Sequence, residues 1–226
     1  MMSGENEQMP LDETTRKLIS EYVEKTLPTD KWYAETFDFI DNEDLRLRLK
    51  IEFSNVRKIY KLFEAIKAEG DMLEAEIRVQ ILMYASIYEA VIHYLLFDKF
   101  ESDLEVQNIL YHTIPKKYSI SKISLEKLKK ELIHDGKEIV PMYYDRCKKD
   151  ITSIRFDDKC KAAHKMGIIT STLKDELIKI YELRNCLHIH AELRKGIDYD
   201  LEMSRTAYRR MKLFISQVKE YCDKEK

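Results

Sequence analysis

The sequence contains few of the residues that interrupt helices, with only five glycines and four prolines among its 226 residues. A fold of many short strands joined by tight turns needs more of both, so a predominantly β architecture is excluded. Charged residues make up 35% of the chain and hydrophobic residues 44%. This mixture, rich in Lys, Glu, Leu and Ile, favours long amphipathic helices around a single core.

The sequence also lacks an excess of charge of one sign, and it lacks paired cysteines. The formal net charge is −2, so any contact with nucleic acid must come from a local basic patch. The four cysteines form no C-x-x-C pair, and no second ligand pair accompanies Cys160 and His164. A structural zinc site needs four ligands. Together with the absence of a glycine-rich phosphate loop, this predicts no metal, no cofactor and reduced thiols.

The chain has no uninterrupted apolar run of the ~18 residues that mark a membrane span. The nearest approach, residues 77–97, is interrupted by Arg78, Gln80, Glu89 and His93. The N-terminal segment is polar and acidic, unlike a signal peptide. These features predict a soluble, cytoplasmic protein with no membrane partner.

Hydrophobic periodicity predicts an all-α fold, an up-and-down bundle of four to five main helices. The main helices are expected at residues 12–27, 42–68, 71–99, 170–195 and 198–221. Residues 1–10 are expected to be disordered and residues 28–42 to form a linker. Residues 11–226 then form a single helical domain.

An irregular insertion is expected at about 101–160, before the helix at 170–195. A lysine-rich helix is expected near 124–134 and another helix near 156–166. Between them, the turn signal Asp135-Gly136 precedes residues 138–140 and 142–144, which predicts at most a small β-hairpin.

The penultimate helix carries an arginine where its apolar series predicts a core residue. Leu173, Leu177 and Ile180 recur at spacings of three and four, and Arg184 is the next member of the series. A guanidinium on an apolar stripe is costly unless it is paired, or faces a cleft or a partner chain. Something must compensate for Arg184, and a functional site is one candidate.

Arg184, the polar Asn185 and His190, on a helix that follows the very apolar helix at 71–99, resemble the motif of the HEPN superfamily. In that motif an arginine, usually followed by a polar residue, precedes a histidine by four to six intervening positions; here five intervene. The resemblance covers residues 71–99 and 170–222. It implies a helical bundle whose paired protomers cleave RNA without a metal, often as a toxin or antiviral effector. Other members have lost the motif and serve as interaction modules.

These residue types suit the chemistry of RNA cleavage. Attack by the 2′-hydroxyl needs a base, an acid for the leaving 5′-oxygen and positive charge beside the phosphorane. A histidine with a pKa near ~6.5 serves either proton role, and the planar fork of an arginine matches phosphate oxygens.

The choice of histidine stays open at this stage. Helix geometry places His188 on the face of Arg184, whereas His190 lies about 120° further round an intact helix. The family spacing selects His190, because His188 leaves only three intervening residues. We take Arg184, Asn185 and His190 as catalytic candidates, with His188 as an auxiliary or a replacement.

Other polar residues are candidates for support and for RNA binding. Glu89 interrupts the apolar helix at 71–99 and is a candidate to hold Arg184 in place. The basic residues around and after the motif could contact RNA phosphates; they are Arg194, Lys195, Arg205, Arg209, Arg210 and Lys212.

The sequence therefore predicts a metal-independent endoribonuclease that acts on RNA as a homodimer, with a regulatory protein or antitoxin as a further partner. The alternative is a non-catalytic helical module that binds a protein, a nucleotide or RNA through the same polar cleft. An arginine and a histidine near a helix C-terminus also interact favourably with the helix dipole and with carboxylates, without any catalytic role.

Overall fold

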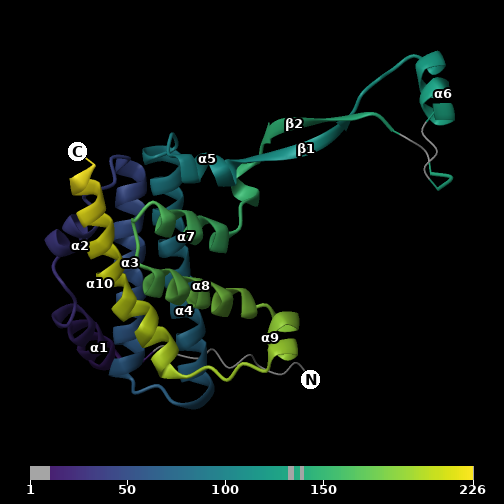
Figure 1. Cartoon of the computed structure of the whole chain (residues 1–226). Coiled ribbons are helices and arrows are strands. Elements are labelled where there is room, and N and C mark those ends of the chain that lie inside the picture. Colours follow the sequence, from purple (N-terminus) through teal and green to yellow (C-terminus); the bar gives the residue numbers. More distant parts are fainter. Residues whose placement is uncertain (1–10, 132–134, 138–139, 226) are drawn as a thin grey trace, which may run out of the picture.

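The computed structural model describes residues 11–131, 135–137 and 140–225, so the segment at 1–10 lies outside the described residues. The chain is mostly helical (Figure 1), which confirms the predicted all-α class. The helices of the body are α1 (Glu13–Lys25), α2 (Asp30–Thr36), α3 (Glu43–Ala65), α4 (Gly70–Tyr94), α5 (Leu104–Leu110), α7 (Phe156–Lys165), α8 (Ser171–Cys186), α9 (Ile189–Lys195) and α10 (Leu201–Lys224).

Helix α4 forms the centre of the bundle and packs against α3, α7, α8 and α10. Its Tyr88 hydroxyl donates a hydrogen bond of 2.6 Å to the Ala207 carbonyl of α10. A π-helical turn, η1 (Leu95–Lys99), continues it. The segment from Gly70 to Lys99 is long and apolar enough to cross a membrane, but 61% of its most apolar window is buried inside the fold. That burial is typical of the core helix of a soluble protein.

The helices begin and end at the residues that cap them. The side chains of Asp12, Asn42 and Thr170 each accept a hydrogen bond from a backbone N–H three residues further on. Gly167, whose φ of +86° lies in the left-handed region, follows α7 just after the helix predicted near 156–166. The short helix α2 stands where we expected a linker, because seven residues are too few to show a helical period.

Residues 111–149, which we call the arm, project away from the helical body (Figure 1). Strands β1 (Tyr111–Lys117) and β2 (Met142–Lys148) pair antiparallel, and α6 (Lys122–Glu131) lies between them in the chain. A small strand pair is present as expected, but it joins β2 to the distant β1 and is not a hairpin about Asp135-Gly136. Residues 138–139 lie outside the described residues. Pro115 obscured β1 in the sequence; a proline is tolerated here because each strand of a two-stranded ribbon has a free edge.

A buried carboxylate on α4 gives the stability of the fold a pH dependence. Glu76 is 3% exposed, and its Oε1 accepts a hydrogen bond of 2.6 Å from Gln80. Burial, reinforced by the nearby Glu64 carboxylate, raises the pKa of Glu76 to about 7, although Arg205 opposes the shift. An acid whose pKa is raised by folding stabilises the fold fully below its unfolded pKa. That contribution is lost as the pH rises through 7.

We expect Glu76→Gln to raise the free energy of unfolding at pH 8 by roughly 1–2 kcal/mol, because the amide has no charge to bury. The advantage should shrink towards pH 5. Urea unfolding from pH 5 to 8 measures it, with the exposed Glu24→Gln as the control. Parallel pH profiles for Glu76→Gln and the native chain would contradict the assignment.

Candidate functional site

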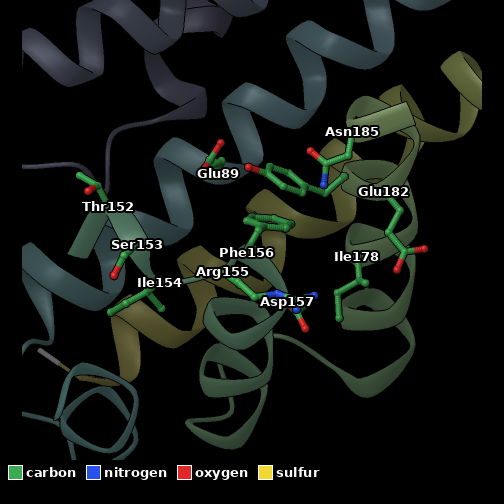
Figure 2. Close-up of a pocket in the computed structure, with 11 residues that line it drawn as sticks. Glu89, Thr152, Ser153, Ile154, Arg155, Phe156, Asp157, Ile178, Glu182 and Asn185 are labelled. Atoms are coloured by element: carbon green, nitrogen blue, oxygen red, sulfur yellow. The ribbon is translucent and has the colours of Figure 1, made fainter. Parts of the chain in front are cut away.

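A cleft of about 300 Å³ lies between α4, α7 and α8 (Figure 2). Phe156 of α7 stacks on Tyr181 of α8, with ring centroids 4.2 Å apart and planes inclined at 22°. Glu89 of α4 and Asn185 of α8 lie at the same end of the cleft (Figure 2). The other lining residues are Thr152, Ser153, Ile154, Arg155, Asp157, Ile178 and Glu182.

Arg184 follows the buried series Leu173, Leu177 and Ile180 and is itself partly buried. It does not line the cleft but contacts two residues that do, Tyr181 and Asn185. Its Nη1 donates to the Tyr181 hydroxyl at 3.1 Å and to the Asn185 side-chain oxygen at 3.3 Å. In the part of the chain that the structure describes, no carboxylate pairs with it. The guanidinium is therefore held by neutral oxygens, and its positive charge is not cancelled by an ion pair.

Tyr181 connects Arg184 to the predicted supporting residue. Its hydroxyl accepts the hydrogen bond from Arg184 and lies close enough to the Glu89 carboxylate to feel its charge. Burial raises the pKa of Tyr181, and the Glu89 charge raises it further. Tyr181 therefore stays protonated and can donate to the carboxylate while its oxygen accepts from the guanidinium. Glu89 thus acts on Arg184 through a phenol and not through a direct ion pair.

A buried lysine that we did not single out from the sequence lies on the other side of Glu89. Lys159 of α7 is 3% exposed, with its Nζ 4.0 Å from Glu89 Oε1 and 3.4 Å from His93 Nδ1. Burial lowers the pKa of Lys159; the pKa of His93 is also lowered, by burial and then by the lysine charge. The signal was available: Lys159 falls in the apolar series of Phe156, Cys160 and Ala163, just as Arg184 does in its own helix.

The motif helix does not continue to residue 195 as expected, because α8 ends at Cys186. Leu187 packs with Ile77 and Tyr199 in a small apolar cluster beside α4. Leu187 precedes α9 and Tyr199 follows it, so both ends of this segment are packed against α4. We attribute the end of α8 to this packing. His188 therefore lies in the connector and His190 in the first turn of α9.

Both imidazoles are exposed, and neither has a hydrogen-bond partner among the described residues. The structure thus brings Arg184, Asn185, Tyr181 and Glu89 together. It does not bring either histidine into contact with them within one chain.

The predicted basic residues divide into two groups. Three arginines of α10 pair with carboxylates: Arg205 and Arg209 contact Glu202 at 3.1 and 2.9 Å, and Arg210 contacts Glu176 at 2.6 Å. Lys212 of the same helix is exposed and has no ion pair among the described residues. Arg194 and Lys195 of α9 are exposed and have no ion pair within the described ranges. Carboxylates therefore offset much of the positive charge that the sequence suggested for α10.

Comparison with protein-family models, with curated proteins and with solved structures finds no match for this chain. The function must therefore be argued from the site itself. Among the described residues, no group of three or more His, Cys, Asp and Glu side chains could hold a metal ion. Next to the cleft lies a guanidinium held by two oxygens of lining residues, an arrangement suited to binding a phosphate group.

Proposed function

We propose that the chain is a metal-independent endoribonuclease of the HEPN type that acts as a homodimer. The observation that carries the proposal is Arg184, a partly buried guanidinium without a carboxylate partner among the described residues, hydrogen-bonded to Tyr181 and Asn185, which line a cleft. The nearby Glu89 carboxylate pairs with Lys159 at 4.0 Å and not with Arg184. A cytoplasmic role as a toxin or phage-defence effector follows from the family resemblance alone.

In this proposal the arginine binds the scissile phosphate and opposes the negative charge that develops on the phosphorane. One imidazole takes the proton of the 2′-hydroxyl, and another donates a proton to the leaving 5′-oxygen. The rings of His188 and His190 are both exposed and neither makes a hydrogen bond to a described residue, so both are accessible to RNA. We keep His190 as the first candidate because its spacing from Arg184 fits the family pattern.

A homodimer is supported by an uncovered stripe on α4. Five exposed residues recur at alternating spacings of three and four, the period of a two-helix interface; they are Met72, Ala75, Val79, Leu82 and Ser86. The stripe is about 21 Å long, and the next residue of the series is Glu89. A second protomer on this stripe would lie beside the cleft and could present its own histidines to the first protomer's Arg184.

RNA digestion in the presence of EDTA tests the proposal. We expect the native chain to cleave single-stranded RNA, and the double variant His188→Ala/His190→Ala to cleave it about 10²–10⁴-fold more slowly, because both proton carriers are gone. The single variants identify the histidine that matters. Lys179→Ala, an exposed position on α8, is the matched control. Undiminished cleavage by the double variant would remove the histidines from the mechanism.

One observation favours the alternative, a non-catalytic helical module that binds a protein, a nucleotide or RNA. Within a single chain, neither His188 nor His190 is oriented by a hydrogen bond, whereas a catalytic imidazole is usually held by a partner. The module predicts no RNA cleavage under any condition. It also predicts that Arg184→Ala affects the stability of the fold or the binding of a partner, and nothing else.

A further inference from the structure

The charge of the chain is divided very unequally between the arm and the body. Residues 111–149 carry ten Lys and Arg against five Asp and Glu, a net charge of +5, whereas the remaining residues carry 29 against 36, a net charge of −7. The near-neutral total therefore conceals a basic projection on an acidic body. Figure 1 shows that this projection extends away from the helices, where a long anionic molecule can reach it.

Strand pairing sorts the side chains of the arm onto two different faces. Because side chains alternate along a strand and cross-strand partners share a face, the register defines each set. One face, which we call the basic face, contains Tyr111, Thr113, Pro115, Lys117, Met142, Tyr144, Arg146 and Lys148. It has three cations and no carboxylate of its own, although Lys148 forms an ion pair of 3.1 Å with Glu101. On the opposite face Lys116 and Asp145 form an ion pair of 2.5 Å and offset each other.

The aromatic residues of the basic face are arranged to stack. Tyr144 is 78% exposed, one of the most exposed large apolar side chains that the structure describes. The Arg146 guanidinium lies over the Tyr111 ring, 4.2 Å from its centroid. Exposed tyrosines beside cations are typical of surfaces that bind unpaired bases, since the rings stack on the bases and the cations bind the phosphates.

We infer that the basic face of the arm binds single-stranded nucleic acid. Seven residues of strand make the face about 23 Å long, enough for several nucleotides. The occupant is assigned by complementarity: Lys117 and Arg146 supply charge without an ion-pair partner among the described residues, and Tyr144 supplies an exposed ring. A duplex would bury its bases and leave Tyr144 with nothing to stack on.

The root of the arm leads from this face to the cleft of Figure 2. Lys148 belongs to the basic face and also lines a second cleft, of about 550 Å³, together with His112 and Lys149. That cleft shares Ser153, Ile154 and Arg155 with the cleft that contains Tyr181 and Asn185. A nucleic-acid strand bound to the arm could therefore extend into the cleft lined by Tyr181 and Asn185, the two residues that Arg184 contacts. This second step rests on the proposed function, whereas binding by the arm does not.

The test measures binding to the full-length protein of a 12-nucleotide fluorescent probe, as single-stranded RNA, as single-stranded DNA and as a duplex. A face variant and a control variant remove the same residue types, so their net charge is equal. The face variant is Lys117→Ser/Tyr144→Ala/Arg146→Ser. The control is Lys25→Ser/Tyr143→Ala/Arg16→Ser, with two exposed cations of α1 and the tyrosine of the opposite face.

We expect the face variant to bind the single-stranded probes at least about 30-fold more weakly, from the loss of one stacking ring and two phosphate contacts. The control should stay within about twofold of the native chain, and Tyr144→Phe should retain binding because the ring remains. Equal binding by the face variant and the control would overturn the inference. So would a native chain that binds neither single-stranded probe, or that binds only anionic vesicles or the duplex.

Binding and cleavage fail independently in this design. Arg184→Ala should keep the affinity for the probe, because Arg184 does not lie on the basic face. If the native chain binds the probe through the basic face but cuts no RNA, the binding inference is supported and the proposed nuclease activity is rejected. If the native chain cuts RNA, and the face variant cuts and binds it as well as the control does, binding by the basic face is rejected and the nuclease proposal is retained.

Discussion

Arg184→Ala is expected to lower the rate of RNA cleavage by about 10²–10³-fold, the usual effect of removing one charge-stabilising donor. The reason is the environment of the guanidinium: it is aimed by Tyr181 and Asn185 and is not neutralised by a carboxylate among the described residues. Arg184→Lys keeps the charge but loses the planar fork, so an intermediate rate is expected. Initial rates on a fluorescent RNA in EDTA measure both.

The same variants separate catalysis from folding. Removing the hydrogen bond from Arg184 to Tyr181 should cost only about 1 kcal/mol of stability, which thermal unfolding reports independently of cleavage. Lys179→Ala is the control on the same helix. A variant that is folded, as thermal unfolding shows, and that still cleaves at the native rate would exclude Arg184 from the chemistry. The alternative module would then be the better account of the site.

The sequence predicted the bundle because the main helices carry their own signals. Asn42, Thr170 and Gly167 mark helix ends by local chemistry alone, and the apolar texture of residues 71–99 identified the central helix. The arm was harder to predict. β1 and β2 are separated by α6, and pairing between distant strands leaves no local signal beyond alternation, which Pro115 interrupts.

The candidate site was predictable as single residues but not as an arrangement. Arg184 stood out because a charge interrupts an apolar series, and the same reasoning applies to Lys159. Tyr181 lies between Arg184 and Glu89 because of the way α4 packs against α8. Residue spacing within a single helix cannot predict such packing. The end of α8 at Cys186 was not predicted either, and the packing of Leu187 and Tyr199 beside α4, to which we attribute it, depends on residues distant in the sequence.

The double variant Val79→Asp/Leu82→Asp is expected to convert the proposed dimer to a monomer. Both residues lie at the middle of the α4 stripe and are 40% and 43% exposed in the single chain. Burying two carboxylates without partners in an apolar interface should raise the dissociation constant at least about 100-fold. Sedimentation equilibrium over a range of protein concentrations measures this change.

Loss of the dimer should also abolish cleavage if Arg184 of one protomer works with a histidine of the other. The matched control is Leu47→Asp/Ile51→Asp on α3, where two equally apolar residues are 55% and 40% exposed but lie away from the α4 stripe. We expect this control to remain dimeric and active. A stripe variant that is monomeric yet fully active would show that each chain holds a complete site. If only the α3 variant dissociates, the dimer interface lies on α3. The stripe that leads to Glu89 would then not place a partner protomer beside the cleft.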